Sequence, residues 1–184
     1  VPEHHIRVIR SSGVNLERFL PVVPVAEPRP LRVLLAARLL WEKGIGEYIE
    51  AARMLRAQGR NIDFVIAGSP DPGNPRSVSR EQVESWVGEG LVDWRGHVED
   101  MPVLMRSMDV IALPSYYREG VPKSLIEAAA CGLAVVTTNL PGCREVVSEH
   151  GVDGLHVEPR CARSLSEKLA SLDDDRALVR QLGD

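Results

Sequence analysis

The stretch "LRVLLAARLLWEKGIGEYIEAARML" at residues 31–55 contains a complete strand–loop–helix unit. Its first part, "LRVLLAA", is almost entirely apolar, which is typical of a parallel strand buried on both faces. After Gly44, apolar residues recur at helical spacing until Gly59, the predicted stop. The residues that carry this spacing are Ile45, Tyr48, Ile49, Ala52 and Leu55. The stretch therefore predicts an α/β fold.

Similar apolar runs recur along the rest of the chain. They are "IRVIR", "IDFVIAG", "VDWRG", "DVIALPS" and "LAVVTT", at residues 6–10, 62–68, 92–96, 109–115 and 133–138. Amphipathic stretches separate them, so we expect a Rossmann-like, doubly wound parallel sheet with helices on both faces. The Pro- and Gly-rich "GSPDPGNPRS" at residues 68–77 is predicted to be a long loop after a strand.

The size of the chain favours one domain. Its 184 residues are enough for one core and few for two, and 44% hydrophobic content excludes a disordered tail. We therefore expect a single domain over residues 1–184. The chain begins without methionine and almost directly in a strand-like run, so we expect a piece of a longer protein.

Charge and cysteine content exclude several classes of protein. The net charge is −4, with no basic stripe of the kind that a nucleic-acid-binding domain shows. Three cysteines without a CxxC pair argue against disulfides or zinc and favour a reducing cytosol. No signal peptide opens the chain, and Arg32 and Arg38 interrupt its longest apolar run. A cytoplasmic protein without a membrane span is expected.

Two cations follow the first strong strand. Arg38 and Lys43 lie in "ARLLWEKGIG", which places them in a strand-to-helix loop at the carboxyl edge of the predicted sheet. Ligands bind at that edge in such sheets, and a pair of cations suits a diphosphate. The alternative is that both are solvated loop charges.

The stretch "SYYREGVPKSLIEAAACG" at residues 115–132 predicts an anion site at a helix N-terminus. Pro122 suits the first helical position, and Gly120 lets a ligand approach the backbone closely. The amide groups of Gly120, Val121 and Lys123 onward can therefore hold an anion.

Two acids in this stretch need separate explanations. Glu119 comes just before the helix, where an acid also simply complements the helix dipole. Glu127 stands among apolar residues of the helix, so its carboxylate either pairs with a cation or accepts hydrogen bonds from vicinal hydroxyls. From Pro122 to Glu127 the helix rises about 7.5 Å. The two acids can therefore address two parts of one extended ligand.

Other features add weaker signals. His97 and Val98 in "RGHV" close a strand and can offer backbone groups to a base, although a lone histidine is more often a surface residue. The Pro141–Gly142 pair is explained by a turn. Neither a dinucleotide GxGxxG nor a P-loop is present, and the acidic run at residues 173–175 is interpreted as a solvated connection. No metal site is predicted.

Together these segments resemble the C-terminal, donor-binding domain of a retaining glycosyltransferase of the GT-B fold, in family 4. The resemblance runs almost end to end. It is carried by "GVNLERF", "ARLLWEKGIGEYIEAARML", "SYYREGVPKSLIEAAACGLAVVTTNLPGCREVV" and "GVDGLHVEP". The acid–seven–acid pair in the third segment is its most specific element.

This resemblance implies a role for each acid and cation. Arg38 and Lys43 would hold the diphosphate of a nucleotide sugar, Glu119 would touch hydroxyls of the donor sugar, and Glu127 would bind the ribose. Arg38, Lys43 and Glu119 would be the catalytic residues. The implied reaction transfers the sugar with retention, without a metal or cofactor and without a covalent glycosyl–enzyme step of the glycosidase kind.

The resemblance also implies partners. The segments "PKSLIEAAACG" and "LPGCREVV" resemble sequences of bacterial enzymes of surface polysaccharide synthesis. Such enzymes commonly use UDP-linked N-acetylhexosamines as donors and lipid-linked acceptors at the inner face of the inner membrane. Such enzymes have an N-terminal acceptor domain, which is absent from this sequence. A nucleotide-sugar epimerase of the same architecture and a non-catalytic nucleotide-sugar-binding module stay open as alternatives.

Overall fold

The computed structural model describes residues 13–21, 29–118 and 120–184 of the chain. Its strands are β1 (Leu31–Ala36), β2 (Ile62–Ala67), β3 (Asp93–Trp94), β4 (Val110–Leu113), β5 (Ala134–Thr138) and β6 (Leu155–Val157). Its α-helices are α1 (Ile45–Ala57), α2 (Arg80–Gly88), α3 (Met101–Met105), α4 (Lys123–Ala130), α5 (Pro141–Arg144), α6 (Ala162–Asp174) and α7 (Arg176–Gly183). A short 3-10 helix, η2 (Trp41–Lys43), precedes α1.

The strands form one six-stranded sheet in the order β3-β2-β1-β4-β5-β6, and every pair in it is parallel. This is the strand order of a doubly wound nucleotide-binding fold, so the predicted fold class is confirmed. The long loop at residues 68–77 follows β2 as predicted. β6 was not among the predicted strands, and the strand predicted at residues 6–10 lies outside the described residues.

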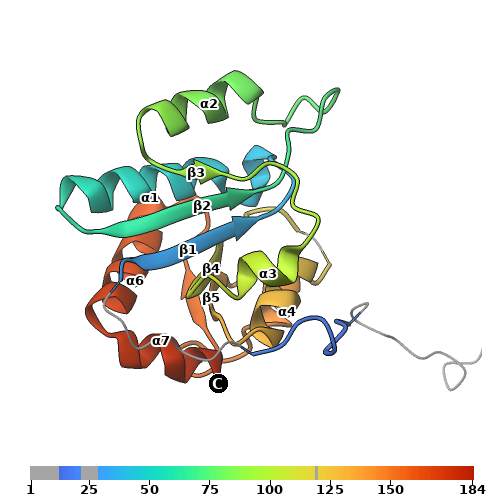
Figure 1. The fold of residues 1–184 in the computed structure, drawn as a ribbon, viewed down its shortest axis with the longest axis vertical. Coiled ribbons are helices and arrows are strands. Elements are labelled where there is room, and N and C mark those ends of the chain that lie inside the picture. Colours follow the sequence, from blue (N-terminus) through green and yellow to red (C-terminus); the bar gives the residue numbers. More distant parts are fainter. Residues whose placement is uncertain (1–12, 22–28, 119) are drawn as a thin grey trace, which may run out of the picture.

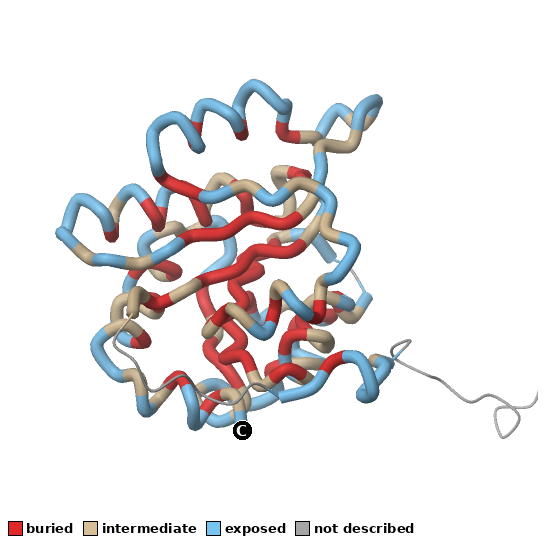
Figure 2. The backbone as a smooth tube through the Cα atoms, in the orientation of Figure 1, coloured by how far each residue is buried: buried red, intermediate tan, exposed pale blue. Residues whose placement is uncertain are grey.

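Helices cover both faces of the sheet (Figure 1). On β1, Leu31, Val33 and Leu35 pack with α1 and α6, whereas Leu34 and Ala36 pack on the other face with residues of α3 and α4. The strands are buried through the centre of the molecule (Figure 2). Burial on both faces explains why the sequences of these strands are continuously apolar rather than alternating between apolar and polar residues.

A buried tyrosine joins α1 to the centre of the sheet. Tyr48 is fully buried, and its hydroxyl lies 2.8 Å from the carbonyl oxygen of Val33 and 3.1 Å from that of Val65. Burial raises the pKa of this hydroxyl well above its usual value. The helix that begins at Ile45 is therefore fixed against both β1 and β2 by a polar contact as well as by packing.

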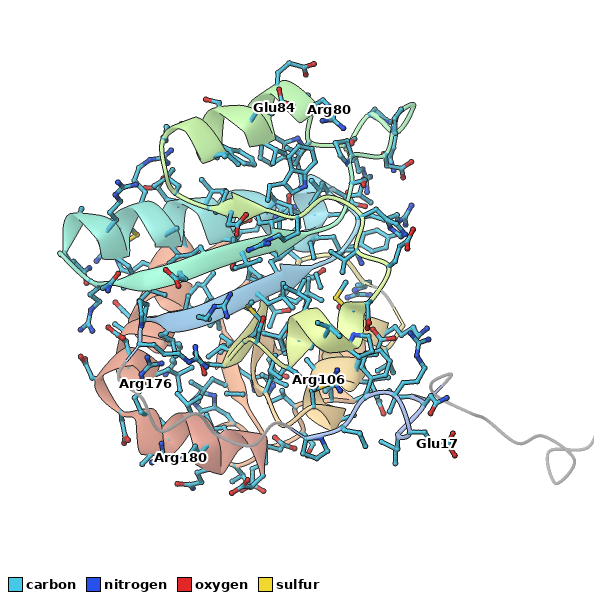
Figure 3. The ribbon with its side chains drawn as sticks, in the orientation of Figure 1. Glu17, Arg80, Glu84, Arg106, Arg176 and Arg180 are labelled. Carbon is cyan, nitrogen blue, oxygen red and sulfur yellow. The ribbon has the colours of Figure 1, made fainter. Side chains whose placement is uncertain are left out.

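Ion pairs hold the amino edge of the sheet, opposite the loops that follow β1 and β4. Arg29 contacts both carboxylate oxygens of Asp109, at 2.9 and 2.6 Å. Arg176 of α7, labelled in Figure 3, donates to the carbonyl of Arg29 at 2.6 Å. The acidic run predicted to be a solvated connection lies where α6 ends and α7 begins. Its Asp173 and Asp174 pair with Arg60 at 3.1 and 2.7 Å, and the Asp174 side chain is 66% exposed.

We predict that Tyr48→Phe lowers the free energy of unfolding at pH 7 by about 1 kcal/mol, because one buried hydrogen bond is lost. Above a pH of about 10 the unfolded chain ionises its tyrosines, while folded Tyr48 keeps its proton. Stability from Tyr48 is therefore present below that pH and lost as the pH rises further. Urea denaturation at pH 7 and at alkaline pH measures both effects. The variant should lose stability less steeply at high pH, and an equally steep loss would contradict the assignment.

Candidate functional site

The candidate site lies at the carboxyl edge of the sheet, between β1 and β4. The chain leaves β1 toward β2 on one side and leaves β4 toward β5 on the other (Figure 1). Diverging connections leave a crevice at such a switch point, where ligands bind in open α/β sheets. The loops after β1 and β4 therefore form the base of the site.

A hollow of about 360 Å³ opens beside the loop after β1. Arg38 from that loop, His97 and Val98 from the segment after β3, and Ser124 of α4 all line it. Three of these were predicted from the sequence as site residues. The fold thus brings together segments that are far apart along the chain.

A second hollow of about 610 Å³ adjoins the first, since Met101 lines both. The turn at residues 13–19 and the start of α3 contribute to its walls. Lys123 and Glu127 of α4 line it as well. A ligand that extends along this edge can therefore contact Arg38 in one hollow and Glu127 in the other.

The two predicted cations occupy different positions. The Arg38 side chain is 68% exposed, and its Nη1 lies 2.9 Å from a carboxylate oxygen of Asp71. Lys43, predicted to lie in a loop, closes the 3-10 helix η2, because its amide donates to the carbonyl of Leu40 at 2.9 Å. Lys43 is not one of the residues that line either hollow.

Gly44 places the loop after β1 against the loop after β4. Its φ is 80°, and a Cβ at this position would lie 2.3 Å from the carbonyl oxygen of Pro114. No side chain fits into that space, so the backbones can approach this closely only with glycine. This contact fixes the position of Lys43 relative to the start of the β4 loop.

A buried polar network also joins these loops. Thr138, at the end of β5, donates to the carbonyl of Ser115 at 2.6 Å, and the Ser115 hydroxyl donates to the carbonyl of Glu42 at 3.1 Å. The Tyr116 amide donates to the same Glu42 carbonyl at 3.0 Å. Ser115 and Thr138 are fully buried. Neither residue was predicted from the sequence, although hydroxyl residues at the ends of apolar strands were a usable signal.

The start of α4 differs from the prediction in one respect. Pro122 is the residue before the helix, with ψ 118°, rather than its first helical residue. This extended conformation lets its carbonyl accept from the amides of Leu125 and Ile126 at 3.1 and 3.4 Å. Among the described residues no side chain caps this end. Gly120 is exposed and Val121 is partly buried.

Glu127 combines burial with a loose ion pair. Its side chain is only 13% exposed, and one carboxylate oxygen lies 3.5 Å from Nζ of Lys123. The cation pairing that was one of its two predicted explanations is therefore present. The predicted apolar surroundings are only partly present, because Ala128 is buried but Ala129 is exposed at the helix surface. Since Glu127 lines the second hollow, its carboxylate can also reach a ligand there.

Glu119 lies outside the described residues, so its position relative to Glu127 stays a prediction.

The segment after β3 is fixed by backbone contacts. The Gly68 amide donates to the carbonyl of Gly96 at 2.7 Å, and the Trp94 indole donates to the carbonyl of Gly68 at 2.8 Å. His97 is exposed and Val98 partly buried. The backbone just before His97 and Val98 is therefore anchored to the end of β2, beside the first hollow.

Neither metal ligation nor membrane spanning is indicated in residues 13–21, 29–118 and 120–184. No group of three or more His, Cys, Asp or Glu side chains there could hold a metal ion. None of the helices there is long and apolar enough to cross a membrane.

Comparison with known proteins gives a family match over most of the chain. The family model described as glycosyl transferases group 1 matches residues 21–184. A Campylobacter jejuni protein named N,N'-diacetylbacillosaminyl-diphospho-undecaprenol alpha-1,3-N-acetylgalactosaminyltransferase is 37% identical over 187 residues, which cover 96% of this chain and 47% of that protein. The chain spans about half the length of the curated relatives it matches.

Solved structures match at similar coverage. The Anabaena protein HepE, crystallised in complex with UDP, has a TM-score of 0.73 and 26% identity, over 84% of this chain and 42% of that one. The crystal structure of the C-terminal domain of a Francisella tularensis glycosyl transferase group 1 protein, LpcC, has a TM-score of 0.76. At 24% identity this second match shows the fold, over 94% of this chain and 93% of that domain.

We predict that Gly44→Ala lowers the free energy of unfolding by more than about 2 kcal/mol, since the new Cβ would overlap the Pro114 carbonyl. Gly59→Ala is the matched control, because Gly59 has a similar φ of 75° but nothing within 4 Å of its Cβ position. Urea denaturation of both variants separates backbone strain from the close contact. Equal losses in the two would show that the contact with Pro114 has no energetic importance.

Proposed function

Because this chain belongs to the glycosyl transferases group 1 family, we propose that its carboxyl-edge site binds a nucleoside-diphosphate sugar, the donor of a glycosyl transfer. The observation that carries this proposal is the arrangement of the two adjoining hollows. Arg38, His97 and Val98 line one, and Glu127 lines the other, at the switch point of the sheet. An elongated ligand with a charged centre and hydroxyl-bearing ends suits this arrangement.

Each part of the donor has a partner in this proposal. Arg38 and Lys43 hold the diphosphate, together with the backbone amides of Gly120, Val121, Lys123 and Ser124 at the start of α4. The backbone at His97 and Val98 contacts the base. Glu127 accepts hydrogen bonds from the ribose hydroxyls, and its low exposure supports this role because a nearly buried carboxylate needs such partners. Glu119 contacts hydroxyls of the sugar.

The proposed chemistry is transfer with retention at the anomeric carbon. The bond between that carbon and a diphosphate oxygen breaks, and its electron pair goes to the departing diphosphate. The oxygen of an acceptor hydroxyl forms the new bond to the same face of that carbon, and the hydroxyl proton goes to the departing diphosphate. Arg38, Lys43 and the N-terminus of α4 stabilise the growing negative charge. This is work that cationic side chains and backbone amides perform in place of a metal ion.

We further propose that residues 1–184 act as the C-terminal, donor-binding domain of a longer enzyme whose N-terminal domain binds the acceptor. The match to the isolated LpcC domain and the coverage of about half of each relative support this division. The transfer itself takes place only when both domains enclose the donor.

The relatives support a choice of donor and acceptor. HepE was crystallised with UDP, and the C. jejuni relative is named for transfer of N-acetylgalactosamine to an undecaprenol-diphosphate-linked sugar. We therefore propose a UDP-linked N-acetylhexosamine as the donor and a lipid-linked glycan as the acceptor, in bacterial surface polysaccharide synthesis. The enzyme would work in the cytoplasm, at the inner face of the inner membrane.

A nucleotide-sugar epimerase would use the same diphosphate site. Product analysis without an acceptor separates it, since only an epimerase converts the donor alone. A non-catalytic nucleotide-sugar-binding module would bind the donor but transfer nothing when joined to its N-terminal domain.

We predict that Glu127→Gln weakens UDP binding by about tenfold or more, because a hydrogen bond to a charged group is worth about 1.5–3 kcal/mol. Titration calorimetry measures this. Glu84→Gln is the matched control, since Glu84 also pairs with a cation four residues earlier, Arg80, at 3.3 Å, but on the exposed outer side of α2 (Figure 3). Circular dichroism must show both variants folded. Unchanged UDP affinity in a folded Glu127→Gln variant would contradict the proposal that Glu127 binds the ribose.

We predict a different outcome for Glu119→Gln. Its proposed partner is the sugar, so UDP affinity should stay nearly constant while UDP-sugar affinity falls by about tenfold. Comparison of UDP with UDP-N-acetylglucosamine and UDP-N-acetylgalactosamine by calorimetry tests this. An equal loss for UDP and for both UDP-sugars would contradict the assignment of the two acids to opposite ends of the donor.

A further inference from the structure

An acid that the sequence analysis did not single out faces the first predicted cation. Asp71 lies in the loop after β2, and its carboxylate is 2.9 Å from Nη1 of Arg38. The Arg38 side chain is 68% exposed and the Asp71 side chain 33% exposed. The contact runs through a single nitrogen of Arg38, so it lacks the two-point geometry that fixes an arginine firmly.

The loop at residues 68–77 holds Asp71 in this place. The Asp71 amide donates to the Ser77 hydroxyl at 2.8 Å, and the Asn74 side chain donates to the Asp71 carboxylate at 3.4 Å. Backbone bonds from Leu39 to Ser69 and from Trp41 to Arg76, at 3.1 and 3.0 Å, join this loop to the one that carries Arg38. Asp71 is therefore anchored, whereas Arg38 is the exposed and movable partner.

The position of this pair creates a conflict with a diphosphate. Arg38 and Asp71 both line the first hollow, so a phosphate group that reaches Arg38 there also meets the carboxylate. The like charges repel each other over a few ångströms. An exposed single-point ion pair contributes little by itself, so exchange of Arg38 from Asp71 to a phosphate is energetically accessible.

We propose that Asp71 is an internal counter-ion that a diphosphate must displace from Arg38, so that it sets the affinity and charge selectivity of the site. This inference rests on the proposed function, because it takes Arg38 as a diphosphate ligand. A ligand with more negative charge gains more from Arg38 and displaces Asp71 more readily. A weakly charged anion leaves the pair intact and therefore gains little from Arg38.

The test compares Asp71→Asn with the unaltered 184-residue chain by titration calorimetry, using UDP, UMP and uridine. Asparagine keeps an oxygen for the Asn74 contact and keeps the backbone amide, so the loop should be preserved. At about 0.05 M salt we expect UDP affinity to rise by roughly threefold or more, UMP affinity to rise less, and uridine affinity to stay constant. The UDP gain should shrink at about 0.5 M salt, where charges are screened within a few ångströms.

Two further variants make the result specific. Asp63→Asn removes the same charge from the amino end of β2, at the opposite edge of the sheet, and should leave every affinity unchanged. In an Arg38→Ala background, Asp71→Asn can relieve repulsion but cannot release Arg38, so its gain for UDP should be smaller. An equal gain in the two backgrounds would overturn the exchange of partners.

The remaining outcomes also decide the matter. Weaker or unchanged UDP binding in Asp71→Asn overturns the inference, and weaker binding would mean that Asp71 aligns Arg38 instead. A gain for uridine as large as that for UDP overturns it too, because the hollow has then changed shape rather than charge. If the unaltered chain binds none of the common nucleoside diphosphates, the proposed function itself fails, and this inference fails with it.

Discussion

The central position of β1 is the constraint on which the rest of this molecule depends. β1 pairs with β2 along its whole length, from Leu31 to Ala36, but with β4 only at Val33 and Leu34. The ladder between β1 and β4 therefore ends before the carboxyl ends of both strands. Because the connections also run in opposite directions beyond this point, the crevice opens between β1 and β4 rather than elsewhere along the carboxyl edge.

Polar contacts join β1 and β4 beyond the point where their strand pairing ends. The carbonyl of Glu42 accepts from the Ser115 hydroxyl and the Tyr116 amide, and Gly44 lies against the backbone of Pro114. These contacts hold the loop after β1 to the loop after β4 although no ladder connects them. An active site needs such rigid support, since residues on loops can position a ligand only as precisely as their own backbones are held.

Elements with a clear local pattern could be predicted from the sequence. Apolar runs identified β1, β2, β4 and β5, and the run at residues 92–96 contains β3. Helical spacing after Gly44 identified α1. β6 was not predicted, because His156 interrupts its short apolar run. The start of α4 was predicted one residue too early, at Pro122, because proline is common both just before a helix and at its first position.

The sequence by itself determined the fold class, the edge of the sheet at which polar residues gather, and the residue types available there. Each of these follows from periodicity over a few neighbouring residues, which the chain carries locally. Only the tertiary structure decided that Asp71 faces Arg38, that Glu127 lines a hollow next to that of Arg38, and that Lys43 lines neither hollow. These contacts depend on strand order, twist and loop packing. The residues involved are far apart along the chain, and their separation in sequence does not determine the distance between them in space.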